Sequence, residues 1–419
     1  MSVLIRRVRL VDETTDTLGS LWIQDRRIAA VYSSEDPEPA LRREGKRPAR
    51  IIEGPELTST GAPPLLLPAF IDPHAHFRDP GFPEKETLES GCLAAAAGGY
   101  GTVVCMANTK PVIDSLEAVW ALQDRARALG LIDLYPVLAL TEGMEGKSTA
   151  HLEALEKRSG LRSLPRLLSE DGKDVEDPLV FQRALRIARN LGIPVSCHCD
   201  REGEDKATQR VLDLGRETGA SVHVAHVSTA GALESIRRAK ARGEFPLTCE
   251  VTPHHMALTA KDAEKLGAQR RGKVHPPLRQ EPDRQAVLRA LEDGTIDAIA
   301  TDHAPHTGAD KENGAPGFTG LETAFAVCFT VLTGERPLGL KKLSALMSAQ
   351  PARLLGLTDR GRLEAGLRAD VVLIDPEKRW TVRPDLFRSR GKNSPFTNRE
   401  LTGQVLMTIH EGRVVYDGL

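Results

Sequence analysis

The chain has 419 residues, and its 56 Lys and Arg against 58 Asp and Glu give a formal net charge of -2, which argues against nucleic acid as a partner. Hydrophobic residues make up 40% and charged residues 27%, as in a folded globular protein rather than a disordered one. No apolar run approaches the roughly 18 residues that span a bilayer, and the N-terminus has no signal-peptide layout. Together with six scattered cysteines, which are typical of reduced thiols, this predicts a cytoplasmic protein without a membrane partner.

The first 60 residues have β character. Residues 2–12 and 19–33 read as two strands joined by a turn, and a polar stretch follows them. This segment is too short to bury a core of its own, so we expect it to pair with another part of the chain.

From residue 65 to about residue 304, short apolar runs alternate with amphipathic segments. The runs are residues 65–71, 101–106, 134–140, 165–169, 193–197, 221–225, 247–251 and 297–301. One intervening segment follows the cap candidates Asp114 and Ser115 and stops at Gly130, as an amphipathic helix does. Eight such units predict an α/β fold of the (β/α)8 TIM-barrel type over residues 65–361, in preference to an open doubly wound sheet.

The end of the chain returns to β character. Residues 307–320, rich in Gly, Pro and polar residues, follow the eighth run, and we expect them to form an active-site lid. Residues 366–376 and 404–418 again read as strands. We therefore expect residues 1–64 and 362–419 to build one composite β-sandwich domain beside the barrel.

Side chains that bind metals follow five of the expected barrel strands. They are His74, His76, Asp171, His198, His226 and Asp302. The carboxyl ends of the strands of such a barrel meet on one face, where the active sites of this fold lie. In an extended segment, residues two apart face the same side, so His74 and His76 can reach one ion.

A second ion can be held in the same way by His198 and His226, with Asp171 bridging the two ions and Asp302 acting on the bound water. Nitrogen and oxygen donors favour Zn²⁺ over Mn²⁺ or Fe²⁺. Two metals that share a water generate hydroxide near neutral pH and polarise a carbonyl. The pattern therefore predicts hydrolysis of an amide, an ester or a phosphoester.

Structural roles compete with these assignments when each residue is taken alone. A single His is more often a hydrogen-bonded structural residue than a ligand, and Asp171 could be a cap or turn residue ahead of Gly172. Arg78 could form a surface salt bridge, and Asn108 could belong to a turn. The joint occurrence at converging strand ends favours the site.

Several stretches of the sequence resemble a known family. The most specific are PHAHFRDPG (residues 73–81), ATDHAPH (300–306) and GLETA (320–324), and the similarity extends over nearly the whole chain. The chain resembles the amidohydrolase superfamily and, within it, the bacterial type I dihydroorotases. The resemblance implies the reversible cyclisation of N-carbamoyl-L-aspartate to L-dihydroorotate and water in pyrimidine biosynthesis, with two Zn²⁺ ions per subunit.

The resemblance also implies a role for each site residue. It makes the six residues above the metal ligands, with Asp302 as the catalytic residue that moves a proton between the bridging hydroxide and the ring nitrogen. The residues expected to bind substrate are Arg78, Asn108, His275, His306, Pro316 and Gly317. Of these, Arg78, Asn108 and His306 hold the carboxylate, for which the planar guanidinium fork of Arg78 is well shaped.

Two departures from the family pattern leave alternatives open. His275 stands where the family commonly has Asn. The carboxylate motif reads Ser169-Glu170-Asp171-Gly172, so Glu170 or a carbamylated Lys173 competes with Asp171 as the bridge.

Other functions compete with the dihydroorotase assignment. One is another cyclic amidohydrolase, similar to a hydantoinase or an allantoinase; a plain hydantoin, however, needs no cationic pocket. Another is a non-catalytic scaffold, although such homologues typically lose metal ligands and this chain keeps all six. As partners we expect the small-molecule substrate, a second copy in a homodimer, and aspartate transcarbamoylase.

Overall fold

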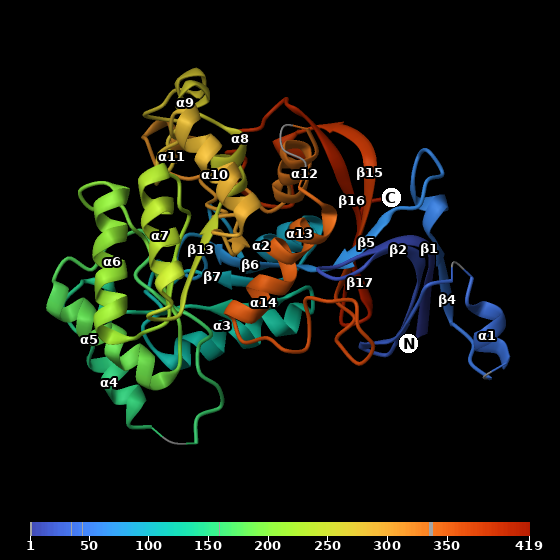
Figure 1. Ribbon diagram of the computed structural model, residues 1–419, viewed down its shortest axis with the longest axis horizontal. Helices are drawn as coiled ribbons and strands as arrows, with labels where there is room; N and C mark the ends of the chain where they lie inside the picture. Colours follow the sequence, from blue (N-terminus) through green and yellow to red (C-terminus); the bar gives the residue numbers. More distant parts are fainter. Residues whose placement is uncertain (1, 35, 44, 159, 335–337) are drawn as a thin grey trace.

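A computed structural model describes residues 2–34, 36–43, 45–158, 160–334 and 338–419. Helices surround a set of short strands in one part of the molecule, and a larger sheet stands at the other end (Figure 1). Both chain termini lie at this larger sheet, so the two ends of the sequence meet there (Figure 1).

The inner strands are short, apolar and largely buried, as expected when helices cover a parallel sheet. They are β6 (Phe70–Ala75), β7 (Tyr100–Cys105), β8 (Asp133–Pro136), β9 (Leu138–Ala139), β10 (Leu168–Ser169), β11 (Val195–Cys197), β12 (Val222–Val224), β13 (Leu247–Val251) and β14 (Ala298–Ile299). All their pairings are parallel, in the orders β6-β7-β8 and β14-β13-β12-β11-β10-β9.

Two connections join these sheets into a ring. Strands β8 and β9 are separated only by Val137, whose N–H donates to the Cys105 carbonyl at 2.9 Å. On the other side, an isolated parallel bridge between Ala75 and His303 joins β6 to the segment after β14. The predicted (β/α)8 architecture is confirmed.

Helices lie between the barrel strands and follow the last of them, and several carry capping residues that can be read from the sequence. They are α2 (Leu88–Ala97), α3 (Leu116–Leu129), α4 (Ala150–Glu156), α5 (Pro178–Leu191), α6 (Glu204–Thr218), α7 (Ala230–Arg242), α8 (Pro253–Ala257), α9 (Ala260–Leu266), α10 (Glu281–Asp293), α11 (Gly308–Glu312), α12 (Ala324–Gly334), α13 (Leu340–Ser344) and α14 (Gln350–Leu354). The predicted ends of α3 are confirmed: Ser115 accepts from the Ala118 N–H, and Gly130 takes the left-handed conformation. Short elements complete the chain: α1 (Glu38–Arg43), η1 (Gly54–Leu57), η2 (Glu142–Met144), the π-helical η3 (Ala345–Ala349) and η4 (Pro384–Leu386).

Strands from both chain ends form one eight-stranded sheet. They are β1 (Ser2–Val11), β2 (Asp16–Gln24), β3 (Arg27–Tyr32), β4 (Arg50–Glu53), β5 (Leu65–Pro68), β15 (Val371–Thr381), β16 (Glu400–His410) and β17 (Arg413–Asp417). The order is β17-β16-β15-β5-β1-β2-β3, with β4 on β1. The domain limits at 64/65 and 361/362 stay a prediction.

The run 65–71, predicted as one barrel strand, is in fact two strands. Strand β5 pairs with β15 and β1 in the terminal sheet, and the barrel begins only at β6. The partners change within one residue, since the Ala69 N–H donates to Asp370 and the Phe70 N–H donates to Gly99. Within this run, strands β5 and β6 are both buried and both apolar, so the hydrophobicity of the sequence does not show where one ends and the other begins.

The remaining expectations concern helices and cysteines. Within the part of the chain that the structure covers, no helix is both long and apolar enough to cross a membrane. All six cysteines are buried and unpaired, in agreement with the expectation of reduced thiols. The segment 307–320 contains α11 and then the pocket residues Pro316 and Gly317.

Candidate active site

The carboxylate of Asp171 lies among four buried histidines at the carboxyl ends of the barrel strands. Its Oδ1 is 3.3 Å from His74 Nε2, and its Oδ2 is 3.4 Å from His76 Nε2. Its Oδ1 is also 3.6 Å from His198 Nδ1 and from His226 Nε2. The side chains form two groups able to hold a metal ion, and Asp171 belongs to both.

The polar atoms of this cluster are better satisfied by a bound cation than by hydrogen bonds to one another. His74 Nε2 and Asp171 Oδ1 are buried and have no hydrogen-bond partner among the described residues. Such unpaired polar atoms are costly in a protein interior, and a cation between them satisfies both. The neighbouring histidines hold the pKa of Asp171 well below its usual range although burial opposes this, so the carboxylate is ionised.

Asp302, in the segment that follows β14, also contacts this cluster. Its Oδ1 is 3.0 Å from His76 Nε2 and 3.7 Å from His74 Nε2. Its φ of 47° is unusual for a residue other than glycine, and His226 has a φ of 34°. Backbone conformations of this kind concentrate at functional sites, where the surrounding structure holds them in place.

Glu250 on β13, fully buried, orients His74 from behind. Its Oε1 is 2.8 Å from His74 Nδ1, and its Oε2 is 2.9 Å from His223 Nε2. When Nδ1–H of His74 donates to Glu250, Nε2 is left free to face Asp171, which is the usual arrangement behind a metal-binding histidine. Glu250 was not predicted from the sequence, where its only signal is a carboxylate inside the buried strand LTCEV.

Asn108 supports His76 in the same manner. Its Oδ1 is 3.0 Å from His76 Nδ1, and its Nδ2 donates to the Asp171 carbonyl at 3.3 Å. Asn108 therefore contacts two of the predicted metal ligands, His76 and Asp171.

A cavity of about 290 Å³ opens over this cluster. All the substrate-binding residues predicted from the sequence line it, as do all the predicted metal ligands except His74. His74 lies fully buried below the wall. The wall also contains Gly172, Asp200 and Ala304, which were not predicted. Asp200 follows His198 by two residues, a spacing that could have indicated it.

Arg78 is the only Lys or Arg residue in the wall of this cavity, within the described residues. Its Nη2 lies 3.2 Å from His306 Nε2, and its Nε donates to the Pro305 carbonyl at 3.3 Å. Burial lowers the pKa of Arg78 to about 10, so it stays charged at neutral pH. Burial and the adjacent Arg78 lower the pKa of His306 to about 3, which makes this imidazole neutral.

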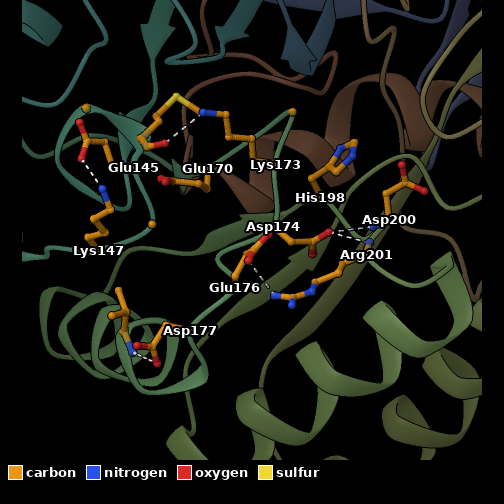
Figure 2. A pocket seen from close by; sticks show the side chains of 15 residues that line it. Glu145, Lys147, Glu170, Lys173, Asp174, Glu176, Asp177, His198, Asp200 and Arg201 are labelled. Carbon is orange, nitrogen blue, oxygen red and sulfur yellow. Dashed lines mark hydrogen bonds and ion pairs between the residues drawn. The ribbon is translucent and has the colours of Figure 1, made fainter.

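The two competitors for the bridging position point elsewhere. The carboxylate of Glu170 accepts from the N–H and the hydroxyl of Thr141, and Lys173 Nζ donates to the Met144 carbonyl. Both line a neighbouring cavity of about 780 Å³ (Figure 2). His198 lines both cavities, so the two adjoin each other.

His275 lies at the rim of the smaller cavity. Its Nδ1 is 3.4 Å from Asp200 Oδ2, and its side chain is 44% exposed. Where the family commonly has Asn, this chain thus places an imidazole paired with a carboxylate.

Sequence comparison places the chain among known enzymes. The model of the amidohydrolase family matches residues 65–415. The chain is 38% identical over 427 residues to the dihydroorotase of Clostridium botulinum (strain Eklund 17B / Type B), covering 99% of this chain and 100% of that protein. It is 40% identical over 380 residues to the dihydroorotase of Caldanaerobacter subterraneus subsp. tengcongensis, covering 84% of this chain and 86% of that one.

Solved structures share the fold. The L-hydantoinase (dihydropyrimidinase) from Arthrobacter aurescens superposes with a TM-score of 0.84 at 24% identity, over 99% of this chain and 96% of that one. The dihydropyrimidinase from Brevibacillus agri NCHU1002 gives 0.86 at 22% identity, over 100% and 95% of the two chains. At these identities the likeness shows the architecture alone.

Proposed function

The chain belongs to the amidohydrolase family, and we propose that it is a dihydroorotase, which interconverts N-carbamoyl-L-aspartate and L-dihydroorotate plus water. The observation that carries this proposal is the charge of the cavity wall: Arg78 stands beside the carboxylate–histidine cluster. A substrate with its own carboxylate needs such a cation, whereas an uncharged hydantoin ring does not. The similarity to dihydroorotases over nearly the full chain supports the same assignment.

We propose Zn²⁺ as the cofactor, two ions per subunit. One would be held by His74 and His76, the other by His198 and His226, with Asp171 shared between them. Two such ions lower the pKa of a shared water and polarise a carbonyl. The nitrogen and oxygen donor set supports zinc.

Asp302 is the proposed catalytic residue. In the hydrolytic direction, it takes a proton from the attacking water and delivers it to the amide nitrogen that leaves the ring carbonyl. In ring closure the same carboxyl group acts in the reverse order. The facing His76 and His74 lower the pKa of Asp302 although burial opposes this, so it starts as the base.

The other predicted residues bind and orient the substrate. Arg78 forms an ion pair with the substrate carboxylate, and Asn108 and the neutral His306 form hydrogen bonds with the substrate. The main chain at Pro316 and Gly317 contacts the substrate ring. His275, paired with Asp200, closes the rim.

Assembly and location are also proposals. The dihydroorotase assignment favours a cytoplasmic enzyme of pyrimidine biosynthesis that acts on a small molecule. We further propose a homodimer and an association with aspartate transcarbamoylase.

The decisive experiment measures metal content and dihydroorotate hydrolysis on one preparation, with hydantoin as the competing substrate. We expect close to two zinc ions per chain and a kcat/KM for dihydroorotate well above that for hydantoin. A preference for hydantoin would overturn the assignment in favour of another cyclic amidohydrolase. A chain without bound metal that stays inactive after reconstitution would be a scaffold instead.

A further inference from the structure

Asn393, which lies between η4 and β16, contacts two loops of the cavity wall from outside the barrel. Its Nδ2 donates to the Ala304 carbonyl at 2.9 Å and to the Gly317 carbonyl at 3.1 Å. Its Oδ1 accepts from the His306 N–H at 3.0 Å. Both amide hydrogens and the carbonyl oxygen are therefore used, and each contact is to the main chain.

The two loops that Asn393 joins carry the proposed substrate contacts. Ala304, His306, Pro316 and Gly317 all line the cavity of about 290 Å³. His306 Nε2 lies 2.9 Å from the Pro316 carbonyl, so the loops also touch each other inside the wall. Asn393 joins the same two loops through its hydrogen bonds from outside the barrel.

Packing leaves little freedom in the segment that carries Asn393. A Cβ at Gly391 would lie 2.5 Å from Pro305 Cβ, so the segment sits directly on the loop after β14. The main-chain oxygen of Asn393 also accepts from the Thr319 N–H at 3.3 Å. These contacts fix the position of the Asn393 side-chain amide relative to both loops.

Lys311, on α11, also holds the loop that carries Gly317. Its Nζ donates to the carbonyls of Lys273, Ala315 and Gly317, each at 2.8 Å. The Gly317 carbonyl thus accepts from Lys311 on one side and from Asn393 on the other. The Gly317 N–H donates to the Lys273 carbonyl at 3.0 Å, so both polar main-chain atoms of Gly317 are held by hydrogen bonds.

Asp302 is anchored without Asn393. Its N–H donates to the His74 carbonyl at 2.9 Å, and the preceding Thr301 is hydrogen-bonded to Asp72. The loss of Asn393 is therefore expected to loosen the substrate contacts and to leave the metal-binding cluster in place.

We propose that Asn393 is a positioning residue for substrate binding, holding His306 and Gly317 at the spacing that the ring and carboxylate of the substrate require. This proposal rests on the proposed function for the identity of the substrate. Binding to a preformed site avoids the cost of ordering the loops, and a misplacement of about 1 Å can cost about 100-fold.

The test compares Asn393→Ala and Asn393→Asp with the wild-type holoenzyme. The Asp variant keeps the shape and the acceptor for the His306 N–H, but it places a carboxylate oxygen against two carbonyl oxygens. We expect KM for dihydroorotate to rise about 10- to 100-fold in both variants, with kcat changed less than about threefold and metal content unchanged. Asn190→Ala, which removes an exposed amide bonded to Glu156, is the matched control.

Hydrogen–deuterium exchange provides a readout that needs no substrate. Peptides covering residues 304–319 are expected to exchange faster in both Asn393 variants, and peptides covering residues 70–76 at the wild-type rate. An unchanged KM with unchanged exchange would overturn the positioning role. Loss of metal together with kcat would make Asn393 a structural residue of the whole site. A wild-type enzyme that does not turn over dihydroorotate contradicts the proposed function, while the exchange result still decides whether Asn393 ties the loops.

Discussion

Replacing Glu250 by Gln is expected to weaken zinc binding without disrupting the site. In the wild type, His74 Nδ1 and His223 Nε2 both face the Glu250 carboxylate, and His223 Nδ1 is 2.8 Å from Thr248 Oγ1. The Gln oxygen can accept from His74, and its NH2 group can donate to His223. His223 then donates through Nδ1 to Thr248. Every hydrogen bond is retained, and only the negative charge is lost.

The magnitude follows from this difference. Removal of a charged partner behind a metal-binding histidine typically costs 10- to 100-fold in metal affinity, which is about 1.4 to 2.8 kcal/mol. Glu250→Ala differs, because it leaves two buried imidazole N–H groups without partners, at about 1 to 3 kcal/mol each. The Ala variant is therefore expected to lose about 2 to 6 kcal/mol of unfolding free energy as well.

The assay is a competition titration of the metal-free protein with Zn²⁺ and a chromophoric chelator. Chemical denaturation of each metal-free variant is measured in parallel. Glu234→Gln, the same change of charge at a half-exposed site on α7, is the matched control. Wild-type zinc affinity in Glu250→Gln would refute the orienting role that we assign to Glu250.

Three further predictions concern Arg78, Asp302 and Glu322. Arg78→Met is expected to raise KM for dihydroorotate about 10- to 100-fold through the loss of a charge-assisted contact, and an unchanged KM in steady-state assays would remove Arg78 from the carboxylate site. Asp302→Asn is expected to lower kcat at least about 100-fold with the fold intact by circular dichroism, and near-normal turnover would exclude it as the base. Burial raises the pKa of Glu322 from 4.5 to about 7, so the folded state binds this proton more tightly than the unfolded state does. Its contribution to stability is fully present below about pH 4.5 and is lost as the pH rises to about 7. Denaturation between pH 5 and 8 should show this decline in the wild type and a smaller decline in Glu322→Gln, and equal slopes would contradict it.

The grouping of Asp171, Asp302 and the four histidines was predictable because it depends on a local rule. A residue just after a barrel strand lies on the catalytic face whichever strand it follows, so His74, His198 and Asp302 could be grouped without knowing any contact. The boundaries of α3 were equally local, since Ser115 and Gly130 act within one helical turn.

The parts that escaped prediction depend on contacts distant in sequence. The change from β5 to β6 is decided by which strands lie alongside, and the residues of both are simply apolar. Glu250 reads as an isolated polar residue until His74 and His223 are placed beside it. Asn393 meets Gly317 from 76 residues away, a pairing that no spacing rule contains.

The pairing of β5 with β15 has a consequence for synthesis on the ribosome. Strand β5 lies between β1 and β15 in the finished sheet, but β15 leaves the ribosome roughly 300 residues after it. At about 5 to 20 residues per second, the open edge of β5 waits about 15 to 60 seconds for its partner. During that interval it is an exposed apolar strand, open to pairing with another nascent chain. Premature pairing between nascent chains is therefore expected at the open edge of β5, until β15 has been translated.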